Sequence, residues 1–275
     1  QFADYDKAYQ NLYPVNFDAD AGTVTLDGYR DTTTRENALV QLNLIGQFAT
    51  GDINHTLLTG MEYGSQDTEN ARRDAFFADS QDDQVSFVFS DPLVIPSMTL
   101  TDPVRDRASD VTFTSAFVQD EIKLNENWIV VAGLRYDNFD IDVVDSIEVA
   151  NGADDGNSGF LSSSDSQVSP RAGLIYKPAE SVSIYASYSK SFLPRSGDQF
   201  LSLSLTSQAL EAEEFENKEI GVKWNFSDSL SVTAAAFEVE RENGTAQDPN
   251  NPEASILTGT ETKGFEVQVV GKLSE

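Results

Sequence analysis

The chain has 275 residues, with 46 acidic and 18 basic side chains and a net charge of −28. This acidity excludes nucleic acid as a partner, because binding to a polyphosphate requires a basic face. The lack of cysteine and the single histidine, His55, argue against disulfides, thiolate or imidazole metal sites and a catalytic triad. The hydrophobic and aromatic content is too high for a disordered acidic chain, so we expect a folded protein without these sites.

Polar and apolar residues alternate with a period of two along much of the chain, and this predicts an all-β protein. Gly, Asp, Asn, Ser and Pro separate the alternating segments. The predicted strands, in chain order, lie near residues 2–13, 24–49, 54–66, 111–124, 127–141, 167–177, 181–193, 215–226, 229–243 and 261–273. No run of about 18 apolar residues predicts a transmembrane helix, and residues 1–10 lack the features of a signal peptide.

The connections between these strands alternate between short and long. Tight turns are predicted at 50–53, 125–126, 178–180 and 227–228, and long acidic connections at 67–110, 142–166, 194–214 and 244–260. Outer-membrane barrels place short turns on the periplasmic side and long loops outside, whereas a soluble sandwich mixes turn lengths at both ends. The strands, about 11–15 residues long, also exceed the globular average of about 5–6. The pattern favours an antiparallel transmembrane β-barrel.

Several strands separate apolar from polar side chains, as a wall between lipid and water requires. In residues 217–226, for example, Ile220 and Trp224 alternate with Glu219 and Lys223. The outward aromatic residues form two groups by height, one near the short turns (Phe48, Trp128, Tyr176, Trp224, Phe226) and one farther up (Tyr63, Tyr136, Tyr188). We expect two interfacial belts about 20 Å apart. A soluble β-sandwich or solenoid with these residues in its core is the alternative.

Seven segments, read in order, resemble the barrel of TonB-dependent siderophore receptors, especially the ferrichrome-type branch. They are residues 55–63 (HTLLTGMEY), 117–124 (FVQDEIKL), 133–137 (GLRYD), 169–178 (SPRAGLIYKP), 185–192 (YASYSKSF), 219–224 (EIGVKW) and 262–267 (TKGFEV). The resemblance implies a barrel of about 22 antiparallel strands in the outer membrane of a Gram-negative bacterium, filled by a plug domain. It also implies import of a ferric siderophore with energy passed on by TonB, so that iron enters only as part of the cargo.

The sequence holds about ten strands of such a barrel, and no plug or TonB-contacting segment is visible in it. We therefore expect residues 1–275 to be an internal fragment of the barrel domain, contributing wall and extracellular loops. Its expected partners are the ferric siderophore, the plug domain of the same receptor, outer-membrane lipid and, through the missing N-terminal part, the TonB complex. Ten strands would leave two unpaired edges in lipid, so we do not expect the fragment to insert alone.

A barrel that captures a metal chelate needs a polar and aromatic surface at its outer mouth rather than an acid, a base or a nucleophile. The aromatic candidates are Phe192 and the pair Phe76 and Phe77 first, then Phe87, Phe89, Phe200 and the inward-facing Tyr185. The candidates for steering an anionic chelate are the basic residues of an acidic loop, Arg72, Arg73, Arg105 and Arg107. The alternative for each aromatic residue is packing within its own loop, and for each arginine neutralisation of acidic neighbours.

Two other functions are compatible with the pattern of turns and strands. A passive porin has the same alternation of short turns and long loops, although the ordered segments and the length of 67–110 argue against it. A soluble secreted β-sheet adhesin would need the outward residues to form a core. The nature of the cargo stays open between types of siderophore, and cobalamin, carbohydrate or, least favoured, haem.

Overall fold

The computed structural model describes residues 1–78, 81–152, 158–195, 200–227, 229–248 and 251–272, with the backbone alone described at 247–248 and 251–256. Strands make up nearly all of it. They are β1 (Phe2–Asp18), β2 (Thr23–Thr50), β3 (Ile53–Phe77), β4 (Gln84–Val88), β5 (Met98–Lys123), β6 (Trp128–Asp145), β7 (Phe160–Ala179), β8 (Val182–Leu193), β9 (Glu213–Ser227), β10 (Leu230–Asp248) and β11 (Asn251–Gly271). Short helical turns occur at α1 (Ser146–Asn151) and at Ser207–Ala209. No helix within the described ranges is long and apolar enough to cross a membrane.

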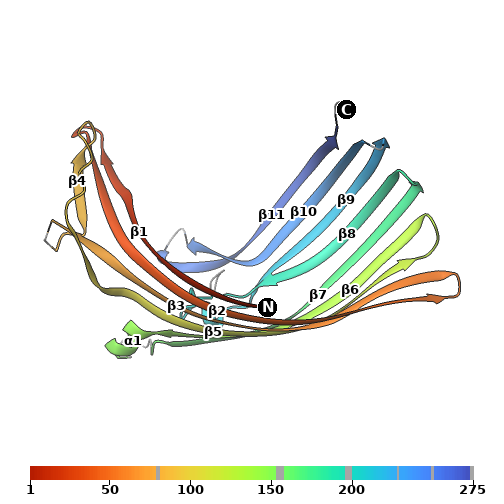
Figure 1. Ribbon diagram of the computed structural model, residues 1–275, viewed down its shortest axis with the longest axis horizontal. Helices are drawn as coiled ribbons and strands as arrows, with labels where there is room; N and C mark the ends of the chain where they lie inside the picture. Colours follow the sequence, from red (N-terminus) through yellow and green to blue (C-terminus); the bar gives the residue numbers. More distant parts are fainter. Residues whose placement is uncertain (79–80, 153–157, 196–199, 228, 249–250, 273–275) are drawn as a thin grey trace.

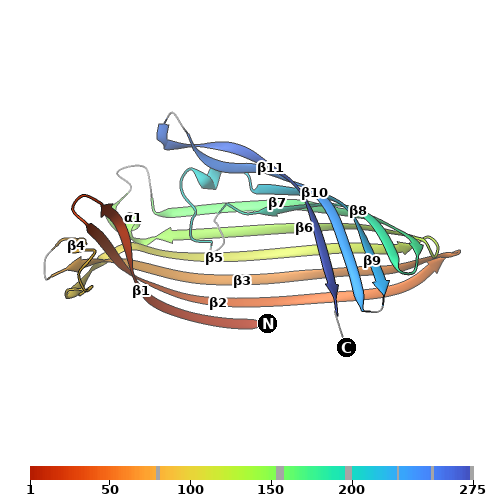
Figure 2. The same cartoon turned by 90° about the horizontal axis from the view of Figure 1, so that it is seen from above.

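The eleven strands form one antiparallel sheet, which confirms the predicted all-β class. Ten of them lie side by side in chain order, from β1 at one edge to β11 at the other, while the short β4 pairs with the start of β2. Figure 1 shows a curved, open wall, with the short turns on its right-hand side and the longer connections on its left. Strands β8–β11 turn away from β5–β7 in both views (Figures 1 and 2). Within the described residues the wall is not closed into a barrel.

The strands are longer than the alternation predicted, and this corrects the expected loops. Residues 67–77 and 98–110 continue β3 and β5 instead of forming a loop, and 142–145 and 160–166 continue β6 and β7. In residues 67–72 the apolar alternation ends because both faces carry mostly polar residues, while Val143 and Leu161 of β6 and β7 face inward into a small apolar core. Nine residues separate Tyr63 from Arg72 in β3, which is about 30 Å of strand. The wall therefore extends well beyond the band that needs an apolar surface.

The two faces of the sheet differ in chemistry from β2 to β11. On one face, apolar residues oppose one another across successive strands, as in Leu42–Met61, Val118–Leu134 and Ala236–Phe265. These side chains are exposed, with 84% of Phe265 and 70% of Leu42 accessible. The other face carries polar residues in register, for example Gln41, Glu62, Ser115, Asp137 and Gln167. We call the apolar face the outer face and the polar face the inner face.

Aromatic residues near the short turns form stacked pairs on the outer face. Trp128 stacks on Tyr176 with ring centroids 4.5 Å apart, and Trp224 contacts Phe226 edge to face at 5.0 Å. Phe48 stacks on His55, whose Nδ1 lies 2.7 Å from Oδ2 of Asp120. Amphipathic rings at one height are typical of the boundary between lipid and water. The rings of the predicted lower belt thus contact one another on the outer face near the short turns, and their position at a membrane interface stays a prediction.

The inner face contains glycines that are covered by aromatic rings from the neighbouring strand. A Cβ added at Gly64 would lie 2.2 Å from Cε1 of Phe113, and one at Gly221 would lie 2.6 Å from the Tyr185 ring. The pairs Gly60–Phe117 and Gly264–Phe237 repeat this arrangement. Each ring occupies the space that a side chain at the glycine position would need. These contacts fix the register between the strands that they join.

Toward the long connections, the inner face of β5–β7 carries a small apolar core. Val111, Ile141, Val143 and Leu161 are buried there beneath Leu203, which is fully buried and belongs to the segment 200–212. The segment fills the space where β8 separates from β7, since the pairing of these strands ends at Arg171–Ser189. It therefore forms an inward-folded cover over the upper part of the wall.

Candidate functional site

The inner face at mid-height is a polar wall organised around Arg135. Its guanidinium group contacts Oε2 of Glu62 at 2.5 Å, Oδ1 of Asp137 at 2.8 Å and Oγ of Ser115 at 2.8 Å. Glu62, Ser115 and Asp137 are cross-strand neighbours in one row of β3, β5 and β6, and Arg135 is the next inward-facing residue of β6. Arg135 thus joins carboxylates from two strands, β3 and β6, into one ion-paired network.

Above this wall, a cavity of about 640 Å³ lies on the inner face of β1, β2, β3 and β5, and Asp145 at the end of β6, Glu148 of α1 and the segment 201–202 complete its lining. Two rows of cross-strand neighbours form its surface. One row consists of Tyr9, Asp31, Arg72 and Arg105, and the next consists of Lys7, Thr33, Asn70, Arg107 and Asp145. Strands are about 4.8 Å apart, so four strands span about 14 Å. Ligand sites in proteins typically measure about 300–1,000 Å³, and this cavity falls within that range.

Two arginines of the cavity are bound to carboxylates. Nε of Arg72 donates to Oδ2 of Asp31 at 3.0 Å, and Nε of Arg107 donates to Oδ2 of Asp145 at 2.8 Å. Burial, the largest single effect, would lower the pKa of Arg72, but the hydrogen bond to Asp31, the charge of Asp31 and the neighbouring tyrosines together outweigh it and raise the pKa. The hydrogen bonds to the carboxylates fix the orientation of both guanidinium groups. Arg107 also donates to the backbone oxygens of Leu201 and Leu203, and so attaches the segment 200–212 to the cavity.

Tyrosines line the β1 side of this surface, and the sequence analysis missed them. Tyr29 makes edge-to-face contacts with Tyr9 and Tyr13, each with centroids 5.9 Å apart, and the guanidinium carbon of Arg72 lies 4.0 Å from the Tyr29 centroid. The hydrogen bond between the hydroxyls raises the pKa of Tyr9 and lowers that of Tyr29. The spacing of Lys7, Tyr9 and Tyr13 at odd positions of one strand could have indicated this shared face.

The structure places the four predicted arginines in two environments. Arg72, Arg105 and Arg107 line the cavity together. Arg73 does not, because a register shift follows Arg72, and its Nη1 donates to the backbone oxygen of Thr101 at 2.9 Å. Their role in steering a chelate stays a prediction.

The predicted aromatic residues do not form one cluster. Phe77 is buried with 1% of its surface exposed, and Phe76 pairs with Thr99 at the top of β3 and β5. Phe87 lies in β4 opposite Val24, while the exposed Phe89 contacts Phe17 edge to face at 6.1 Å.

The other predicted aromatic residues lie on or near the inner face. Phe192 contacts Phe139 edge to face at 5.7 Å, and Phe200 packs on the apolar core beneath the segment 200–212. Tyr185 faces inward as predicted, lies over Gly221, and donates its hydroxyl to Oε1 of Glu219 at 2.5 Å. A contact between any of these seven aromatic residues and a siderophore stays a prediction.

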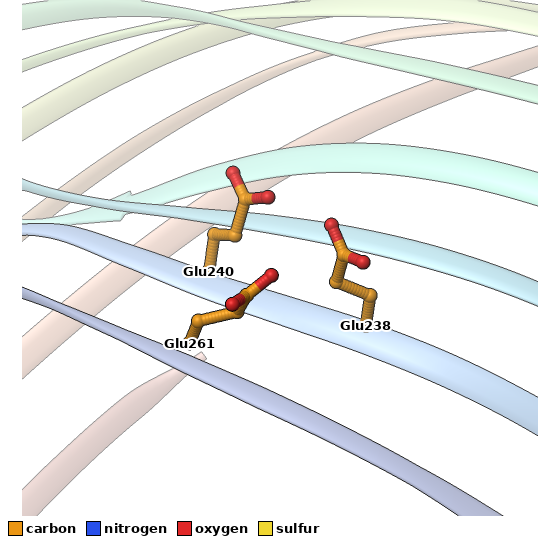
Figure 3. A group of neighbouring side chains, drawn as sticks. All are labelled: Glu238, Glu240 and Glu261. Atoms are coloured by element: carbon orange, nitrogen blue, oxygen red, sulfur yellow. The ribbon is translucent and has the colours of Figure 1, made fainter.

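Three carboxylates, Glu238, Glu240 and Glu261, approach one another where β10 pairs with β11 (Figure 3). Their oxygens lie within 4.8 Å of one another. Lys218 reaches Glu240 at 3.1 Å, and Lys263 reaches Glu238 at 3.1 Å and Glu261 at 2.5 Å. The ammonium groups of Lys218 and Lys263 already balance most of the negative charge of these carboxylates. We therefore interpret the three glutamates as part of a network of ion pairs rather than as a metal site.

An open antiparallel wall with an apolar outer face, a polar inner face and a cavity beyond the apolar band defines a membrane-barrel receptor or channel. The family model "TonB dependent receptor-like, beta-barrel" matches residues 1–274. The chain belongs to this family of TonB-dependent receptor β-barrels.

Individual relatives agree with this assignment. The chain is 29% identical over 265 residues to the probable TonB-dependent siderophore receptor PiuA of Acinetobacter baumannii, covering 88% of this chain and 34% of that protein. It is 27% identical over 282 residues to the metal-pseudopaline receptor CntO of Pseudomonas aeruginosa, covering 97% of this chain and 37% of that protein. The crystal structure of PiuA superposes with a TM-score of 0.77 at 25% identity, covering 92% of this chain and 38% of PiuA. The chain spans about a third of the length of the curated relatives it matches.

Proposed function

We propose that this chain forms part of the wall and outer mouth of an outer-membrane receptor that imports a ferric siderophore with energy from TonB. The observation that carries the proposal is the cavity on the inner face, which lies beyond the apolar band and combines arginines, a lysine and a tyrosine. Such a surface can bind an oxygen-rich chelate by charge-assisted hydrogen bonds and ring contacts. The relatives named as siderophore or metallophore receptors support the same reading.

In this proposal each face of the wall has its own partner. Outer-membrane lipid covers the apolar outer face between the aromatic belts, and the plug domain of the same receptor faces the polar wall around Arg135. No group of this chain needs to act as an acid, a base or a nucleophile, since transport changes the location of the chelate and leaves its bonds intact. Contact with TonB belongs to other parts of the receptor.

The test is uptake of radioactive iron by cells that carry the full-length receptor as their only ferric-chelate importer. We expect saturable uptake that disappears when TonB is deleted or the proton gradient is collapsed, while binding of the chelate persists. Arg107→Gln should reduce uptake at low chelate concentration, because it removes the contact with Asp145 and the anchor of the segment 200–212. The matched control, Arg73→Gln, should retain uptake, since its side chain lies outside the cavity. Uptake that is linear with concentration and independent of energy would indicate a porin instead.

A further inference from the structure

Several cations of the inner face lie close together at the upper end of the wall, beside the carboxylates of Asp31 and Asp145. The inner face there carries Lys7, Arg35, Arg72, Arg105 and Arg107 on four neighbouring strands. The outer face at similar height carries exposed acids, namely Asp4, Asp6, Glu36, Asp67, Glu69, Asp110, Asp140 and Asp142. The outer face also carries Arg30, opposite Arg73, so the separation of charge between the faces is partial, but in the cavity lining the cations outnumber the acids although the whole chain has a net charge of −28.

Two cations of the cavity have no carboxylate partner in the described part of the chain. Nζ of Lys7 lies over the Tyr9 ring, 4.4 Å from its centroid, and the Arg105 side chain is exposed at the end of its row. Arg72 and Arg107 are bound to Asp31 and Asp145, as described above. The remaining acid of the lining, Glu148, forms no ion pair with a described residue, so four cations and three anions leave a net charge of 4 − 3 = +1.

The register shows how one ligand could meet both free cations. Lys7 begins one row and Arg105 ends the next, so they lie on opposite sides of the floor formed by Thr33, Asn70 and Arg72. A ligand seated on this floor would place one oxygen-rich edge toward β1 and another toward β5. A neutral ligand would desolvate both cations without giving them a counter-charge, and that desolvation is unfavourable.

We propose that this cavity selects ferric chelates of net negative charge, with Lys7 and Arg105 as direct contacts and the Tyr9 ring as an adjoining surface. The proposal rests on the proposed function and narrows its substrate class. Deprotonated catecholate or carboxylate oxygens supply the required charge, whereas a neutral tris-hydroxamate chelate does not. Lys7 and Arg105 hold the ligand by charge-assisted hydrogen bonds, and Glu148 limits the affinity by repulsion.

The experiment is calorimetric titration of the full-length receptor in detergent with two probes, a trianionic ferric tris-catecholate and a neutral ferric tris-hydroxamate. We expect tighter binding of the trianion, weakened by raising the salt concentration. Lys7→Gln and Arg105→Gln should each weaken trianion binding by about tenfold or more, the value of one charge-assisted hydrogen bond. Glu148→Gln should strengthen trianion binding. None of these three substitutions should change the binding of the neutral probe. Arg73→Gln is the matched control, which should bind both probes as the unmodified receptor does.

Each other result overturns the proposal in a distinguishable way. Equal or tighter binding of the neutral chelate, with no response to either substitution, would refute the charge selection and leave the proposed function intact. A similar loss for both probes would assign Lys7 and Arg105 a structural role. Failure of the folded receptor to bind either chelate would refute the proposed function together with this inference.

Discussion

Arg195 anchors the inward-folded segment 200–212, and its removal should release that segment. The Arg195 side chain is only 3% exposed. Its Nε donates to the backbone oxygen of Glu211 at 2.5 Å, its Nη1 contacts Oε1 of Glu213 at 3.3 Å, and its Nη2 donates to the backbone oxygen of Asn243. Glu213 keeps a second partner, since Arg241 lies 2.6 Å away. Arg195→Ala therefore leaves two carbonyl oxygens without a donor, whereas the carboxylate of Glu213 keeps its ion pair with Arg241.

The cost of this change follows from those two carbonyls. A buried acceptor without a donor costs about 1–3 kcal/mol. Both bonds are part-buried and only the Glu211 carbonyl belongs to the segment, so Arg195→Ala should destabilise the closed position by about 1–3 kcal/mol. The lower value corresponds to about a fivefold larger population of the open form. Proteolysis of a transiently open segment follows that population. Chymotrypsin, which cleaves after residues such as Phe200 and Leu203, should therefore cut the variant at least about fivefold faster.

The assay is a time course of chymotrypsin cleavage of the full-length receptor, with the cleavage sites identified by mass spectrometry. Arg73→Ala is the control, because it also removes an arginine but breaks only an exposed hydrogen bond to Thr101. Arg195→Lys should give an intermediate rate, since an ammonium group can satisfy part of the set. Equal cleavage within 200–212 in the Arg195→Ala variant and the unmodified receptor would refute the anchoring role.

Three further predictions concern the same wall. Gly64→Val should lower the stability of the barrel by about 1–3 kcal/mol, because the new Cβ would collide with the Phe113 ring; an unfolding midpoint equal to that of Gly46→Val, where nothing lies within 4 Å, would contradict this. Leu203→Ala should cost about 2–5 kcal/mol locally and speed hydrogen exchange in 200–212, because it empties a fully buried position. Burial raises the pKa of Asp165 above its unfolded value, so its charge opposes folding at neutral pH, and this cost fades as the pH falls through the folded pKa. Asp165→Asn should therefore slow local exchange at pH 7 relative to the unmodified receptor, with a smaller gain near pH 4; a gain of the same size at both pH values would show that the charge of Asp165 is not the cause.

The membrane-facing part of the fold could be predicted from the sequence because lipid imposes a strict pattern. Every second residue of a spanning strand must be apolar, and residues such as Leu134 and Ile220 follow this rule. The upper parts of β3 and β5 could not be predicted in this way, since water on both faces removes the constraint. The short β4 was not predicted either, because only residues 84–88 pair with β2 and so short a segment shows no clear alternation.

The candidate site was predictable only in part. Arg72, Arg105 and Arg107 stood out as cations in an acidic region, and the register brings them to one face. Their carboxylate partners Asp31 and Asp145 lie far away in the sequence, so no local pattern identifies them. The sequence could not predict which face of the sheet Phe76 and Phe77 occupy, because the register shifts between Arg72 and Ala75 interrupt the alternation of faces along β3.

The central claim is that the two faces of this wall contact lipid and the receptor's interior, respectively. The chain contains no cysteine, so a single fluorophore can be placed at Val267→Cys, on the outer face, or at Glu266→Cys, on the inner face, without interference from this part of the receptor. In vesicles containing nitroxide-labelled lipid, we predict strong quenching of the label at residue 267 and little at residue 266. Equal quenching at both positions, or stronger quenching at residue 266, would contradict the assignment of the faces and the position of the cavity that depends on it.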